Sequence, residues 1–94
     1  MVTVDAQRLE DIAREALANG VEEAALDQLL PVAETAENAR LWQFAGLLQR
    51  SLDEHAAALG SFKRAADLAP TDPSIAQGLA RVALEAGVDL GTHA

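Results

Sequence analysis

One short segment of the sequence brings together side chains that could bind a metal or exchange a proton. Asp53, Glu54 and His55 are consecutive, and His93 is the other histidine of the chain. Carboxylates beside an imidazole can ligate zinc or form an acid–base pair. In a helix, consecutive side chains point about 100° apart, so three neighbours do not converge on one atom. We therefore interpret the triplet as a cap and the solvated start of a helix.

The other candidates for chemistry are few. Glu22 and Glu23 are expected in the first turn of a helix, where acidic groups interact favourably with the helix dipole. The sequence contains no glycine-rich phosphate loop, no nucleophile elbow and no zinc-binding helix motif. We therefore predict that the chain is not an enzyme, with no catalytic residue, no metal site and no cofactor.

Charge and composition argue against several classes of partner. Fifteen acidic residues against seven basic ones give a net charge of −8, which repels nucleic-acid phosphates and anionic membranes. Cysteine is absent, which excludes disulfides and thiolate metal sites. The first residues lack the basic and apolar regions of a signal peptide, and no apolar run reaches the roughly 20 residues of a membrane span. We expect a cytoplasmic protein that binds neither nucleic acid nor membrane.

Apolar positions recur at helical spacing in five segments, which predicts an all-α chain. Alanine, the best helix former, supplies much of the apolar half of the sequence. Capping and stop residues divide the segments. The first two expected helices run from Thr3 or Asp5 to Asn19-Gly20, and from about Val21 into the mid-thirties with Pro31 inside. The other three follow Asn38, start near Asp53 and stop at Pro70, and run from Asp72-Pro73 to Gly87.

A helix pair recurs along the chain with a period of 33 to 34 residues. An offset of 33 aligns a set of four positions in the fourth helix with four in the second: Ala58, Leu59, Phe62 and Ala65 with Ala25, Leu26, Leu29 and Val32. Repeats of this length are typical of helical arrays in which each unit buries its apolar face against its neighbours.

Residues 39–72 resemble one complete tetratricopeptide repeat. Six positions match the family's signature in register: Trp42, Gly46, Ala58, Phe62, Ala65 and Pro70. Two depart from it, because Ala45 replaces the usual leucine and Gln49 the usual tyrosine. The resemblance implies a single domain over 1–94, with repeats at 6–38 and 39–72, a half repeat or capping helix at 73–86 and a tail at 87–94. The implied fold is a short right-handed solenoid of antiparallel helix-pair repeats with about five helices.

The resemblance also implies a partner-binding groove lined by the first helix of each unit. By register, its residues are Gln7, Arg14, Arg40, Gln43, Phe44, Leu47, Arg50, Gln77 and Arg81, with Glu10, Leu17, Ser74 and Leu84 at equivalent positions. Four of the seven basic residues fall in this set, which predicts an acidic protein or peptide as partner. In the second interpretation, these arginines are solvating charges that pair with Glu10, Glu85 or other neighbours.

Two functions are compatible with the sequence. The first is a non-catalytic protein–protein or protein–peptide interaction module. The alternative is an N-terminal scaffold segment of a larger multidomain bacterial protein, such as a sulfotransferase or glycosyltransferase with tetratricopeptide repeats, because the fifth helix resembles half of a third repeat. That helix also predicts homo-oligomerisation if Ile75, Leu79 and Val82 lack a helix to pack on, unless Phe62 and the fourth helix cover them.

Overall fold

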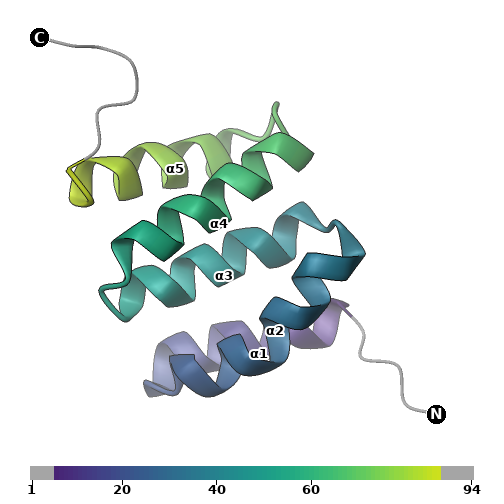
Figure 1. Ribbon diagram of the computed structural model, residues 1–94. Helices are drawn as coiled ribbons and strands as arrows, with labels where there is room; N and C mark the ends of the chain where they lie inside the picture. Colours follow the sequence, from purple (N-terminus) through teal and green to yellow (C-terminus); the bar gives the residue numbers. More distant parts are fainter. Residues whose placement is uncertain (1–5, 88–94) are drawn as a thin grey trace, which may run out of the picture.

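The computed structural model describes residues 6–87 of the 94-residue chain (Figure 1). Within these residues the protein has five α-helices and no β-strand, which confirms the prediction of an all-α chain with five helices. The helices are α1 (Ala6–Asn19), α2 (Glu22–Ala36), α3 (Ala39–Ser51), α4 (His55–Leu68) and α5 (Pro73–Glu85). Thr3 and Asp5, the expected caps of α1, lie outside the described residues.

Local capping signals set several of the helix ends. The side chain of Asn38 accepts hydrogen bonds from two backbone N–H groups in the first turn of α3, at 2.9 and 3.3 Å. Asp72 caps α5 in the same way, with Pro73 at the first helical position. α1 stops before Gly20, whose φ of 75° is reached at little cost only by a residue without Cβ. These ends agree with the prediction because capping involves residues within three positions of each other.

The start of α4 differs from the prediction. We expected it near Asp53, but the helix begins at His55. Asp53 has a φ of 60°, and its backbone N–H donates to the Arg50 carbonyl at 3.0 Å, so it belongs to the turn that ends α3. Aspartate tolerates this left-handed conformation better than most residues, and it is also a good cap. The local sequence therefore did not distinguish the two roles.

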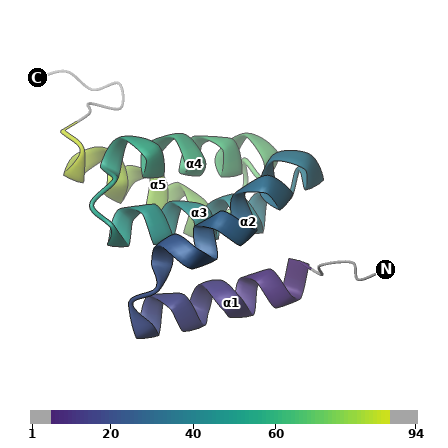
Figure 2. The ribbon, with the colours of Figure 1, turned by 60° about the horizontal axis from the view of Figure 1, so that its bottom comes forward.

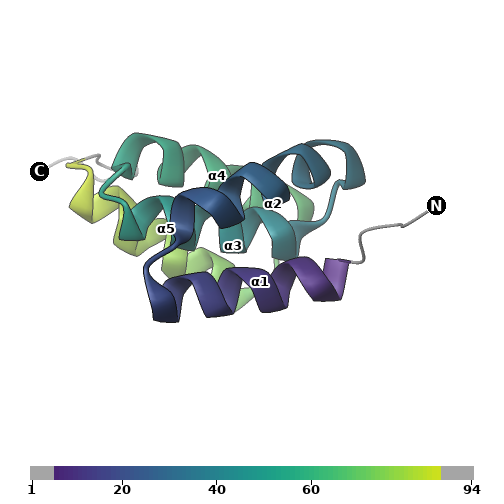
Figure 3. The same cartoon turned by 90° about the horizontal axis from the view of Figure 1, so that it is seen from below.

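Consecutive helices run antiparallel, and α3 packs against all four of the others (Figure 1). Figure 2 shows α1 along one side of the molecule, with α2 crossing obliquely beside it. Seen from below, α2 and α4 lie in one layer and α1, α3 and α5 in the other (Figure 3). This alternation places the first helix of each predicted unit on a common surface.

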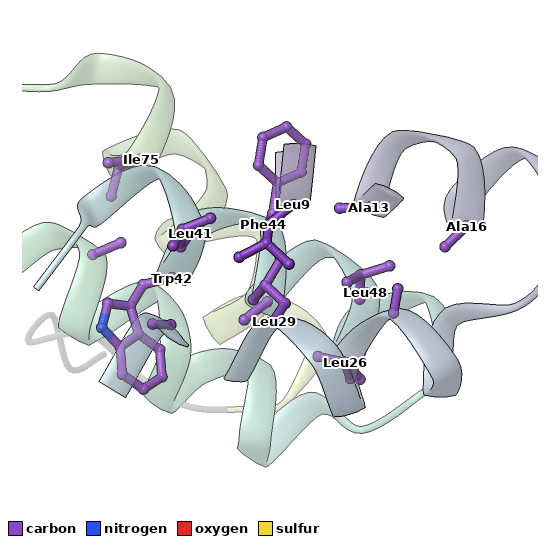
Figure 4. Close-up of a cluster of buried hydrophobic side chains, with 14 residues drawn as sticks. Leu9, Ala13, Ala16, Leu26, Leu29, Leu41, Trp42, Phe44, Leu48 and Ile75 are labelled. Atoms are coloured by element: carbon purple, nitrogen blue, oxygen red, sulfur yellow. The ribbon is translucent and has the colours of Figure 1, made fainter. Parts of the chain in front are cut away.

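Buried side chains form two clusters that meet at α3. The larger cluster lies mainly among α1, α2 and α3, with Ala65 and Ile75 reaching it from α4 and α5 (Figure 4). The smaller one joins α4 to α5 and centres on Phe62. Leu47 packs against both clusters. Five of the six signature positions are buried, and the sixth follows the end of α4 at the surface: Trp42, Gly46, Ala58, Phe62 and Ala65, then Pro70.

Gln49, where the repeat family usually has tyrosine, makes a buried polar link between α3 and α4. The residue is only 7% exposed. With its amide nitrogen turned toward α4, it donates to the Ala57 carbonyl at 3.1 Å and to Ser61 Oγ. Ser61 is itself buried, so each polar group has a partner that water cannot supply there. Hydrogen bonds thus replace the packing that an aromatic ring would provide.

The expectation that Ile75 and Val82 lack cover is wrong. Ile75 is 1% exposed and Val82 is 0% exposed, because the first joins the larger cluster and the second packs with Phe62 in the smaller one. Leu79 is partly buried against the smaller cluster. The alternative in which Phe62 and α4 cover these side chains is confirmed. The large apolar side chain that α5 does expose is Leu84, at 80%.

Candidate functional site

Three long-range pairs of hydrogen-bonded side chains show that α1, α3 and α5 share one surface, which we call the α1/α3/α5 surface. Arg40 Nε donates to Glu10 Oε1 at 3.3 Å, which joins α3 to α1. Gln43 Nε2 donates to Ser74 Oγ at 3.2 Å, which joins α3 to α5. Further along, Arg50 of α3 reaches Glu85 of α5. The structure therefore gathers residues that the sequence spreads over more than 70 positions.

Phe44, which we expected to offer an apolar contact in the groove, is buried. Its exposed fraction is 8%, and it belongs to the cluster drawn in Figure 4. Two guanidinium groups cover its ring, with Arg14 Cζ at 5.3 Å and Arg40 Cζ at 6.0 Å from the ring centroid. Cations over an aromatic face are attracted by its negative quadrupole. The ring therefore serves as a support for two arginines and not as a free apolar surface.

The same two arginines share one acidic partner. Glu10 Oε1 lies 3.7 Å from Arg14 and 3.3 Å from Arg40, and the Glu10 side chain is only 13% exposed. Arg14 also contacts Asp11 at 3.2 Å, and Gln7 donates to that carboxylate. At this end of the surface, the predicted groove cations are thus paired within the chain, as the second interpretation of the sequence had it.

Arg50 is paired even more closely. Its Nε and one terminal nitrogen donate to the two carboxylate oxygens of Glu85, at 2.7 and 2.8 Å. These hydrogen bonds are the main reason that the pKa of Glu85 lies below its ordinary value, although partial burial opposes the change. The charges of Arg50, His55 and Arg81 add to the same effect. A planar guanidinium that meets both oxygens of a carboxylate is a strong and directional pair.

His55 lies at the start of α4, as the sequence suggested, but its side chain is only 33% exposed. Its Nδ1 is buried without a hydrogen bond, 3.9 Å from Glu85 Oε1, while its Nε2 is 3.8 Å from Asp53 Oδ1. The two carboxylates flank opposite ring nitrogens, so they cannot hold one metal ion together with the ring. No group of three acidic or histidine side chains in residues 6–87 is arranged to hold a metal. His93 lies outside the described residues.

Ser51, His55 and Asp53 line one hollow, and they are the residue types of a hydrolase triad. In a triad, one ring nitrogen faces the serine and the other faces the carboxylate. Here both ring nitrogens face carboxylates, and the Ser51 hydroxyl donates to Glu22 Oε2 at 2.5 Å. Nucleophile and base are therefore not paired in this arrangement.

Two hollows adjoin Arg50 on the α1/α3/α5 surface, and Leu47 and Arg50 line both of them. The first has a volume of about 500 Å³, with the other residues Leu17, Ser51, Asp53, His55 and Glu85. The second lies between α3 and α5, has a volume of about 180 Å³ and is lined further by Phe62, Ser74, Gln77, Gly78, Arg81 and Val82. Four predicted groove residues line this second hollow: Leu47, Arg50, Gln77 and Arg81.

Sequence reasoning placed Leu17, Leu47 and Arg50 of the first hollow on the groove, but it did not predict that His55 and Glu85 complete the wall. His55 and Glu85 are 30 positions apart, and they meet only because α4 and α5 pack side by side. The one local signal was a histidine next to an acidic pair, which is common at helix starts. Gly78 was also missed as a packing residue, although a glycine inside a helical pattern is a signal of close contact.

Within residues 6–87, no helix is both long enough and apolar enough to cross a membrane. Searches against protein-family models, curated proteins and solved structures found no match to the chain.

Proposed function

We propose that this chain is a tetratricopeptide-type interaction module that binds a protein or peptide segment on the α1/α3/α5 surface, in the cytoplasm. The observation that carries the proposal is the hollow between α3 and α5. Its wall combines apolar side chains, such as Leu47, with the exposed polar side chains of Gln77 and Arg81. Binding sites for peptide segments typically combine apolar contact area with a few oriented polar groups.

Arg81 supports an acidic segment as the partner. It is exposed, and among residues 6–87 no carboxylate lies within ion-pair distance of it, in contrast to Arg14, Arg40 and Arg50. Arg81 interacts with Glu85 only through space, so its guanidinium can donate to a ligand carboxylate without first losing a hydrogen bond to a carboxylate of the protein. Because the site is open to water, we expect binding that is weak and sensitive to salt.

Charge reversal at Arg81 tests this function. The probe is a fluorescently labelled peptide of about ten residues, rich in glutamate and leucine, and binding is followed by fluorescence anisotropy. We expect Arg81→Glu to raise the Kd about tenfold, and rising salt to weaken binding to the wild-type chain. Circular dichroism should show unchanged helicity, because Arg81 is exposed.

The matched control is Lys63→Glu, which makes the same change of charge at an exposed residue of α4 that lines neither hollow. We expect this variant to bind the peptide nearly as well as wild type. Equal weakening by both variants would mean that the peptide responds only to the net charge. Absence of any binding to the wild-type chain at low salt would rule out an acidic segment as the partner.

A further inference from the structure

Arg50 lines both hollows of the α1/α3/α5 surface, and its guanidinium is already bound by a carboxylate of the protein. Glu85 binds it through both oxygens, at 2.7 and 2.8 Å. The side chains of both residues are about one-third exposed, 35% for Arg50 and 34% for Glu85. A ligand carboxylate can therefore approach the pair from solvent.

His55 stands beside the same carboxylate with an unused nitrogen. Its Nδ1 is buried, has no hydrogen-bond partner and lies 3.9 Å from the Glu85 oxygen that accepts from Arg50 Nε. The other charged groups around the ring are Asp53, 3.8 Å from Nε2, and Arg81, which acts on Glu85 through space. Unpaired buried polar atoms are uncommon, because each costs free energy. His55 lines the hollow of about 500 Å³, and its Nδ1 is covered on the side of Glu85.

The position of Glu85 in the fold also allows its side chain to move away from Arg50. It is the last residue of α5, and its side chain belongs to neither buried cluster. If the Glu85 side chain moved away, the protein would lose the ion pair with Arg50, but the core would stay closed. An exposed ion pair of this kind is worth little net free energy, because water and salt compete with it. Glu85 therefore occupies the Arg50 guanidinium in the free protein, and a ligand carboxylate can displace it.

We propose that Arg50 and His55 form a carboxylate-binding subsite for an acidic side chain of the partner, and that Glu85 occupies it as an internal competitor. The proposal rests on the proposed function, since it describes how the same surface receives an acidic segment. The partner's carboxylate replaces Glu85 on the Arg50 fork, with His55 Nδ1 on its other side. Glu85 thereby raises the Kd of the partner.

Removal of the competitor is the first test. With the labelled acidic peptide used above, Glu85→Gln should lower the Kd about three- to tenfold relative to wild type. Glu34→Gln is the matched control, because it removes one negative charge from an exposed residue of α2 that lines neither hollow. The gain from Glu85→Gln should disappear when Arg50→Gln is added. If Glu85→Gln lowers helicity, Glu85→Asp, which keeps the charge but shortens its reach, should give a smaller gain in its place.

Substitution of His55 is the second test, and it is made in the Glu85→Gln variant. A peptide carboxylate on Arg50 then lies beside His55 Nδ1, which can donate a hydrogen bond to it. Adding His55→Leu to Glu85→Gln should therefore raise the Kd about three- to tenfold, because this donor is lost. Circular dichroism checks that the helicity is unchanged.

The outcomes separate the two proposals. If Arg81→Glu weakens binding but Glu85→Gln tightens it no more than Glu34→Gln does, the surface binds the peptide and the competitor idea is wrong. The competitor idea also fails if the gain survives Arg50→Gln, and the role of His55 fails if adding His55→Leu to Glu85→Gln leaves the Kd unchanged. If wild type does not bind the peptide at low salt, the proposed acidic partner is ruled out, and this inference fails with it.

Discussion

The Phe62 side chain limits the size of the residues that pack against it. The ring is 1% exposed and lies between glycines of two other helices. A Cβ added at Gly46 would lie 2.6 Å from Cδ2 of the ring, and one at Gly78 would lie 2.5 Å from Cε1. Glycine inside a helix costs about 1 kcal/mol relative to alanine. The close approach of α3 and α5 to the ring explains why glycine is nevertheless found at both positions.

Alanine at these two glycines should therefore destabilise the protein despite its better helix propensity. We expect Gly46→Ala and Gly78→Ala each to lower the free energy of unfolding by about 1–3 kcal/mol, the usual cost of overpacking a core. Gly60→Ala is the control, because nothing lies within 4 Å of its added Cβ, and it should stabilise by up to about 1 kcal/mol. Urea denaturation measures all three. Equal stabilisation by all three variants would show that the ring yields to the added methyl group.

The helices are held to one another by polar contacts as well as by the core. The Ser51 hydroxyl, at the end of α3, donates to Glu22 at the start of α2. This bond is the main reason that the pKa of Glu22 lies below its ordinary value of 4.5. Asp72 at the start of α5 behaves similarly, because its hydrogen bond from Ser74 lowers its pKa. Each of these contacts depends on an ionised carboxylate.

The acid stability of the protein should depend on the Ser51–Glu22 bond. A lowered pKa in the folded state means that the carboxylate stabilises the fold fully above its unfolded pKa. This contribution disappears as the pH falls through the folded pKa. We therefore expect Ser51→Ala to lower the Tm at pH 7 and to reduce the further loss of Tm on going to about pH 3.

Ser61→Ala is the control for this measurement. Its hydroxyl bonds to the neutral amide of Gln49, so the loss of Tm should be the same at both pH values. Thermal melts followed by circular dichroism give both quantities. If Ser51→Ala loses the same Tm at pH 7 and at about pH 3, Glu22 does not contribute to the pH dependence.

At the scale of the whole molecule, residues 6–87 leave part of the α5 surface uncovered. Ala76 and Ala80 are exposed, and Leu84 continues the same helical stripe at 80% exposure. The residues of α3 that align with the first two are Trp42 and Gly46, both of which are buried beside α4. An apolar stripe of this kind is a common site of association between protein molecules.

We expect the chain to self-associate through this stripe of α5. Sedimentation velocity between about 10 µM and 1 mM should show a concentration-dependent shift to a larger species, because small apolar interfaces bind weakly. Leu84→Glu should abolish the shift. The matched control is Leu68→Glu on α4, where the leucine is also exposed, at 41%, and this variant should associate as wild type does. A wild-type chain that stays monomeric throughout the range would contradict the prediction.

The helices and their ends could be predicted from the sequence alone, because the forces involved are local. Asn38 and Asp72 cap helices through backbone groups within three residues, and Gly20 permits a backbone conformation at its own position. The periodic apolar positions likewise predicted the helices themselves, although Phe44 was expected on the groove and is buried. Where two local roles suit one residue, as with Asp53, even the helix boundary was misplaced.

The candidate site depended on the tertiary structure. Whether Arg50 remained free or bound Glu85 was decided by the angle and register at which α5 packs on α3, and neither is encoded within a few residues. The same packing buried Phe44 beneath two arginines and set His55 against a carboxylate 30 positions away. Side-chain pairing over such separations follows from the sum of many packing contacts. The types of residue on the α1/α3/α5 surface were therefore determined by the sequence, and their partners by the fold.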